Sequence, residues 1–432
     1  MTEGPTGGLT TEGPSTRLAR RLGLPDAVVI GLGSMIGAGV FAALGPAAAA
    51  AGSGLLIGLA AAAVVAYCNA TSSARLAAVY PQSGGTYVYG RERLGDFWGY
   101  LAGWGFVVGK TASCAAMALT FGAYAAPGWR RPLAVAAVVA LAAVNYRGVR
   151  KTAALTRLIV AVVLASLAAV VVAALLGGTA SGDNLGSLTV GGVRGVLEAA
   201  GLLFFAFAGY ARIATLGEEV VDPARTIPRA IPTALAITLA VYAAVAVAAL
   251  LAAGPEALAG STAPLATAAH AGSLDWLAPA VRVGGALAAL GVLLSLVAGV
   301  SRTVFAMAAD RRLPAWLDAV HPRHAVPHRA EIAVAALVAV LVLMADLRSA
   351  IGFSSFTVLA YYGITNASAW TLPAERLRPR LVAAAGGLGC AVLAFTLPPS
   401  SVVLGAVALG IGAGAWLLQG ALLRSRSGTG ER

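Results

Sequence analysis

Apolar residues run along the chain in long stretches, and short polar segments separate one stretch from the next. A helix crosses a membrane with about 20 apolar residues. Stretches of that length predict twelve spans, near residues 27–50, 53–79, 97–125, 132–146, 154–177, 195–215, 229–253, 277–308, 330–346, 350–371, 381–397 and 401–422. No loop between them is long enough for a soluble domain. We expect one transmembrane domain over residues 26–423, between an N-terminal tail (1–25) and a C-terminal tail (424–432).

Composition agrees with a protein embedded in a lipid bilayer. The chain is 59% hydrophobic and 11% charged, whereas soluble domains carry about 25% charged residues. Its three cysteines, Cys68, Cys114 and Cys390, all lie in apolar stretches, so no disulfide framework is expected. The net charge of +12 by itself would suit a nucleic-acid partner. The positions of the basic residues argue against nucleic acid, because they follow the loops of a membrane topology.

Lysine and arginine gather in every second loop. The side that holds the N-terminus carries 23 of the 30 basic residues. Positively charged loops stay in the cytoplasm. We therefore expect a multi-pass protein of the cytoplasmic membrane with both termini in the cytoplasm, which requires an even number of spans.

The first apolar stretch contains four glycines between Gly31 and Gly39. Glycine inside a helix costs roughly 1 kcal/mol relative to alanine. Close helix packing through Gly33 and Gly37 would explain part of this pattern. A dinucleotide-binding loop would need a preceding strand and a soluble βαβ unit, and neither is present. We favour a broken helix whose free backbone amides face an anion, since such breaks occur at membrane depth only inside protein or beside a polar cavity.

A second interrupted span lies five spans further on. Residues 204–212 form an apolar run that Gly209 interrupts, and polar residues follow it. Two interrupted spans at corresponding places in two halves of a chain mark the substrate site of many secondary transporters. No residue-level repeat between the halves is visible, so the symmetry is inferred from pattern alone.

Four segments together resemble the amino acid–polyamine–organocation superfamily. They are Gly31 to Phe41, Tyr80 to Tyr89, Phe204 to Tyr210 followed by Glu218, Glu219, Asp222 and Pro223, and Ser301 to Pro314. They occur in the family's order, and the resemblance extends from about residue 20 to 420.

This resemblance implies an all-α membrane protein with a leucine-transporter-like fold. Ten core helices would form a 5+5 inverted repeat with broken helices 1 and 6, and two peripheral helices would bring the total to about twelve. An amino acid would lie between the two breaks. The backbone near Ala38 and Gly39 would bind its carboxylate, and the carbonyls of Met35, Phe205 and Ala208 its ammonium. Phe205 would close over the substrate. The substrate-binding residues implied are Ser34, Met35, Ile36, Gly37, Ala38, Gly39, Phe205, Ala208 and Gly209.

The chain departs from the family pattern at residues that bear on energy coupling. Many relatives have an acidic residue after the sixth-span break, where this chain has Ala211 and Arg212. Leu164 aligns with a lysine that replaces a sodium ion in many relatives, and Arg75 with an acid. Lys110 lies instead midway along the third span. A charge at this depth is a functional candidate. Both a proton carrier and a structural ammonium bonded to helix-end carbonyls fit it.

The other charged groups have simpler interpretations. Glu198 is expected to pair with Arg194 one turn earlier, with a coupling acid as the alternative. Glu218 and Arg212 are candidates for gating or coupling on the cytoplasmic side. His321, His324 and His328 share one loop, and without an accompanying cysteine or acidic cluster we expect a solvated basic loop rather than a metal site.

The sequence thus predicts a permease that imports a neutral amino acid by alternating access, with a proton as coupling ion and without a cofactor. An amine or polyamine permease, an amino acid exchanger and a transport-inactive sensor remain alternatives. Polyamines would want carboxylates in the cavity, and the first and sixth spans supply none. No set of catalytic residues is visible, so we do not expect an enzyme.

Overall fold

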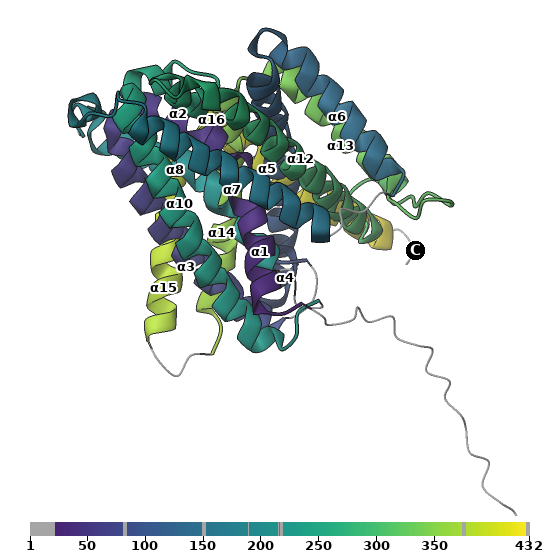
Figure 1. Ribbon diagram of the computed structural model, residues 1–432. Coiled ribbons are helices and arrows are strands. Elements are labelled where there is room, and N and C mark those ends of the chain that lie inside the picture. Colours follow the sequence, from purple (N-terminus) through teal and green to yellow (C-terminus); the bar gives the residue numbers. More distant parts are fainter. Residues whose placement is uncertain are drawn as a thin grey trace, which may run out of the picture.

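The computed structural model describes residues 22–80, 84–148, 153–188, 190–214, 216, 219–373 and 377–428. Within these ranges the regular structure is helical, apart from one isolated parallel bridge between Leu22 and Val220. Most of the predicted N-terminal tail lies outside the described residues, as do residues 429–432. Figure 1 shows the helices gathered into one bundle.

The α-helices have the following bounds: α1 Leu24–Met35, α2 Ala38–Ala51, α3 Leu55–Val79, α4 Thr86–Leu94, α5 Asp96–Ala125, α6 Arg130–Tyr146, α7 Ala153–Leu176, α8 Gly192–Phe207, α9 Ala211–Ala214, α10 Pro223–Ala259, α11 Pro264–His270, α12 Ala278–Ala309, α13 His328–Met344, α14 Leu347–Trp370, α15 Arg378–Thr396 and α16 Pro399–Gly428. Short 3₁₀ turns link several of them, including η4 Ala208–Tyr210.

Helices cover each of the twelve predicted stretches. Nine segments of the described chain are long and apolar enough to cross a membrane, counting α2 and α3 as one continuous segment. The helix α13 is shorter, with 17 residues. The all-helical membrane class is therefore confirmed, whereas the number twelve and the inverted repeat remain predictions.

Glycines and a charged first turn shape the first span. Pro25 lies in the first turn of α1, where its missing N–H costs nothing. The carboxylate of Asp26 accepts a hydrogen bond from the backbone N–H of Gly23 at 3.4 Å. The helix ends at Met35, and α2 begins at Ala38 after a non-helical Gly37. The predicted break in the first span is present.

The helix α5 lies at the centre of the bundle. It packs against α12 and α14, and its most apolar window is 78% buried, the highest fraction among the candidate spans of the described chain. The two halves of the first span pack against different helices, α1 against α10 and α2 against α8. In Figure 1, α6 and α13 lie together at one edge, away from the broken helices.

Different contacts tie the helices at the two ends of the bundle. We call the end with Leu22 the N-terminal side and the other end the far side. On the N-terminal side Arg157 of α7 pairs with Asp26 of α1 at 2.8 Å. On the far side Arg348 of α14 pairs with Glu198 of α8 at 2.6 Å. Each ion pair therefore holds one half of a broken span against a neighbouring helix.

Candidate substrate site at the two helix breaks

The first break separates two helix ends of opposite polarity. The amide of Ile36 donates to the carbonyl of Leu32 at 2.7 Å, which is the last helical bond of α1. The ψ angle of Gly37 is −144°, far from the helical value near −42°. The first amides of α2 therefore have no acceptor within their own helix. They carry the partial positive charge of a helix N-terminus, which favours an anion such as a carboxylate.

The second break is a tightening of the helix. α8 ends at Phe207, η4 makes one 3₁₀ turn, and the four-residue α9 follows. Ala208 keeps a right-handed helical conformation, with φ of −61° and ψ of −5°. The C-terminal end of α8 presents carbonyl groups and partial negative charge at this place, which favours an ammonium group.

The two breaks touch through their backbones. A Cβ atom at Gly39 would lie 2.7 Å from Cα of Ala206, and one at Gly209 would overlap the carbonyl group of Ser34. Such approaches require glycine. The structure thus brings together residues of the first and sixth spans that lie about 170 positions apart.

The other predicted site residues lie at the same place with different exposure. Met35 and Ile36 are buried, with 1% and 2% of their surface exposed, and Ala208 is buried as well. Phe205 is half-buried. The hydroxyl of Ser34 donates to the carbonyl of Ile30 at 2.9 Å, within its own helix. The backbone of Ser34 contacts the second break at Gly209.

Two tyrosines that sequence reasoning missed bond to the carbonyls of the breaks. The hydroxyl of Tyr242, on α10, is in hydrogen-bond contact with the carbonyl of Met35 and lies 3.1 Å from that of Ala206. The hydroxyl of Tyr362, on α14, donates to the carbonyl of Ala208 at 3.3 Å. A tyrosine in an apolar span needs a partner for its hydroxyl. The sequence therefore indicated that each tyrosine hydroxyl has a hydrogen-bond partner, but not which group that partner is.

Lys110 lies on the inner helix α5 and is half-buried. Met117 and Tyr124 follow at seven-residue intervals, so the three side chains share a face of α5. The hydroxyl of Tyr124 donates to the carbonyl of Phe41 in α2 at 3.1 Å. Tyr124, at the far end of this face, therefore contacts the first span. Within the described chain, no hydrogen bond or ion pair joins Lys110 to another residue.

The charged residues predicted to gate or couple have different surroundings. Glu198 pairs with Arg348, so the prediction that Arg194 is its partner was wrong. The two residues of the observed pair lie 150 positions apart, and no local spacing reveals such a contact. Arg212 is exposed on the short α9. Glu218 lies outside the described residues.

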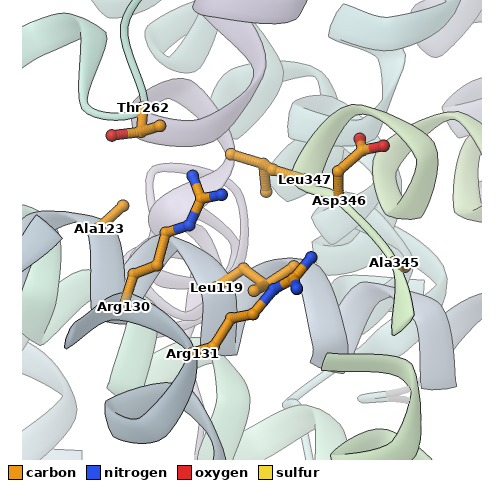
Figure 2. A pocket seen from close by; sticks show the side chains of 8 residues that line it. All are labelled: Leu119, Ala123, Arg130, Arg131, Thr262, Ala345, Asp346 and Leu347. Carbon is orange, nitrogen blue, oxygen red and sulfur yellow. The ribbon is translucent and has the colours of Figure 1, made fainter. Parts of the chain in front are cut away.

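A small cavity opens on the far side, away from the breaks. Figure 2 shows the guanidinium groups of Arg130 and Arg131 beside Thr262 and Asp346. Its volume of about 40 Å³ suffices for roughly three water molecules. Asp346 is the N-cap of α14, and its carboxylate accepts hydrogen bonds from the backbone N–H and the hydroxyl of Ser349. With a volume of about 40 Å³, the cavity is too small for an amino acid.

The three loop histidines pack against one another and against Tyr146, and each remains partly exposed. The rings of His321 and His324 lie 4.7 Å apart between centroids, and those of His321 and His328 lie 5.4 Å apart. All three contact Tyr146 at the end of α6. Arg323 and Ala325 in the same loop are exposed, so the interpretation as a solvated basic loop stays a prediction, with an aromatic contact to Tyr146 that the sequence pattern did not link to this loop.

Comparison with known proteins identifies the family of this chain. The sequence profile of the family described as "Amino acid permease" matches residues 26–380. The chain belongs to this family. It is a transporter and not an enzyme.

The chain is 66% identical over 400 residues to an uncharacterized transporter of Mycobacterium tuberculosis, covering 92% of this chain and 91% of the relative. It is 27% identical over 336 residues to a branched-chain amino acid permease of Bacillus subtilis, covering 72% of each chain. It is also 29% identical over 376 residues to a human cationic amino acid transporter, covering 80% of this chain and 59% of the relative.

Proposed function

We propose that this protein imports a neutral amino acid across the cytoplasmic membrane by alternating access, with a proton as the coupling ion. The observation that carries this proposal is the backbone contact of two broken spans, Gly39 against Ala206 and Gly209 against Ser34. At this contact the N-terminus of α2 lies near the C-terminus of α8. The two helix ends offer complementary charge to the carboxylate and the ammonium of an amino acid without ionised side chains.

The side chains around the breaks favour a neutral substrate. Met35, Ile36, Phe205 and Phe207 are apolar. A substrate side chain with its own charge would need a partner to offset desolvation there. The branched-chain permease among the relatives agrees with this preference, and the cationic transporter is the counterexample.

The ties at the two ends of the bundle suit alternating access. If the N-terminal side faces the cytoplasm, Asp26–Arg157 closes the inner path and Glu198–Arg348 the outer one. Each tie links one half of a broken span to a helix outside that span. Opening either path then requires one ion pair to separate while the other holds.

A proton fits the coupling step better than sodium. Lys110 is an ionisable group within the central helix α5. A charged side chain inside a span is a functional candidate, and here we assign it the role of proton carrier.

Uptake into proteoliposomes tests the proposed function. Labelled L-leucine, L-alanine, L-arginine and putrescine are offered with and without an inwardly directed proton gradient. We expect accumulation of leucine or alanine that the gradient stimulates. Transport of arginine or putrescine alone would replace the neutral substrate, and the absence of transport for all four would favour a sensor.

Lys110→Met tests the proton role. We expect this variant to keep amino acid exchange but to lose stimulation by the proton gradient. Lys110→Arg is the matched control, because it keeps a positive charge that does not titrate. Normal gradient-driven uptake by Lys110→Met would eliminate Lys110 as the carrier and leave it a structural role.

A further inference from the structure

The carbonyl groups at the two breaks already have hydrogen-bond donors from the protein. Tyr242 serves Met35 and Ala206, one carbonyl from each broken span. Tyr362 serves Ala208 in the second break. Both tyrosines are buried, with 2% and 1% of their surface exposed. These donors come from α10 and α14, which are not part of either broken span.

Aromatic contacts pack both tyrosine rings against residues of the second break. The ring of Tyr242 lies 5.3 Å from that of Phe207. The ring of Tyr362 stacks on Tyr210 at 5.1 Å and meets Phe204 edge-on at 5.8 Å. Phe204, Phe207 and Tyr210 flank the second break. The two tyrosines therefore contact this break through ring packing as well as through hydrogen bonds.

We propose that Tyr242 and Tyr362 are positioning residues that stand in for the substrate ammonium at these carbonyls. When no substrate is bound, their hydroxyls satisfy the carbonyls, and the ammonium of an entering amino acid displaces them. This inference rests on the proposed function, since it assumes that the amine binds at the breaks.

The strengths of the two kinds of hydrogen bond support displacement. A buried carbonyl without a donor is costly. A phenol hydroxyl removes that cost with a neutral bond, whereas an ammonium group makes charge-assisted bonds that are roughly twice as strong. The tyrosines therefore stabilise the site without substrate and still yield to an amine. A solute without an amino group has nothing with which to displace them.

The stand-in role concerns one half of the transport cycle. Net uptake requires the carrier to return without substrate, and during that return the two tyrosine hydroxyls are the side-chain donors to the carbonyls of Met35, Ala206 and Ala208. Exchange avoids this step, because the carrier is loaded in both directions. Loss of a hydroxyl should therefore impair net uptake more than exchange.

Tyr242→Phe and Tyr362→Phe provide the test, with L-leucine as substrate in proteoliposomes. We expect each variant to lower the KM for leucine about 2- to 10-fold, and to lower the ratio of net uptake to exchange by a similar factor. Tyr124→Phe is the matched control. It removes another buried hydroxyl that bonds a carbonyl of the first span, that of Phe41, away from the breaks.

The competing interpretation predicts the opposite sign. If the tyrosines orient the carbonyls for the substrate, each Phe variant would raise the KM and reduce exchange and net uptake together. That outcome would overturn the inference, as would a variant inactive in both assays, because the proposal requires exchange to survive. If the wild-type protein transports no amino acid, the proposed function fails. If the wild type transports leucine and the variants behave as in the competing interpretation, only the stand-in role fails.

Deaminated leucine, 4-methylpentanoate, gives a second measurement. We expect it not to compete with leucine in the wild-type protein but to compete measurably in the double variant Tyr242→Phe/Tyr362→Phe, where no hydroxyl needs to be displaced. Equal competition in both proteins would contradict a stand-in role.

Discussion

The two breaks differ in how far the backbone departs from a helix. In the first span, Gly37 is non-helical and separates α1 from α2. In the sixth span, the chain stays right-handed through η4 and merely tightens. Their glycines differ as well. A side chain on Gly37 would meet the side chain of Val292, whereas one on Gly209 would meet the backbone of Ser34. The less irregular break is therefore the less tolerant one, because backbone cannot rotate away.

The largest effect should come from Gly209→Ala. The new methyl group would overlap the carbonyl group of Ser34 and force the two breaks apart. A displacement of about 1 Å at a reacting or binding site costs on the order of 100-fold in activity. We expect leucine uptake per molecule of protein to fall by about this factor. Gly363→Ala in α14 is the control, since a Cβ there meets no atom within 4 Å. Near-normal uptake by Gly209→Ala would refute the contact between the breaks.

Gly37→Ala should be milder and repairable. Its methyl group would overlap Cγ2 of Val292, a side chain that can shift or be shortened. We expect roughly a 10-fold loss of uptake, and recovery of most of it in Gly37→Ala/Val292→Ala, since residues in contact are not additive. Uptake assays on the four proteins of this cycle check it. If trimming Val292 gives no recovery, the conformation of Gly37, rather than the space around it, is what matters.

The sequence revealed the helix breaks but not the side chains that donate hydrogen bonds to their carbonyl groups. Four glycines between Gly31 and Gly39, and Gly209 five spans later, are local signals that need no knowledge of the fold. Tyr242 and Tyr362 carry no such signal, because their acceptors lie on other helices. The ion pair of Glu198 with Arg348 was missed for the same reason, and helix periodicity pointed instead to Arg194. Contacts between distant segments depend on how the helices pack, and a single sequence does not contain that in readable form.

Removing the far-side ion pair should have an intermediate effect. The side chain of Glu198 is 16% exposed, so Arg348→Gln leaves a largely buried carboxylate without its partner. We expect a loss of about 1–2 kcal/mol in thermal stability. Glu198→Gln/Arg348→Gln should recover part of it, because the double variant has no unpaired charge. Thermal unfolding in detergent measures both. If the single and the double variant unfold at the same temperature, the unpaired carboxylate of Glu198 costs no stability, and the ion pair does not stabilise the position of α8.

The smallest effect should come from the N-terminal-side ion pair. Arg157 and Asp26 are 64% and 36% exposed, and such pairs contribute about 0–1 kcal/mol. We expect Arg157→Gln to change the unfolding temperature little and to shift uptake less than 3-fold, with the difference vanishing at high salt. Arg157 is the residue to change, because Asp26 also caps α1. A large effect that persists in high salt would mean that α1 depends on this contact for its position.

The bridge between Leu22 and Val220 has a mechanical consequence. The amide of Leu22 donates to Glu219, and the amide of Val221 donates back to Leu22, at 3.1 and 2.9 Å. Gly23 alone separates Leu22 from α1, and Val220 lies between α9 and α10. The bridge thereby ties the start of α1 to the segment that connects α9 with α10. We expect probes placed on α1 and on α9 to keep their separation throughout the transport cycle while both move relative to α12. The N-terminal side of the bundle would then open by one concerted movement of α1 and α9.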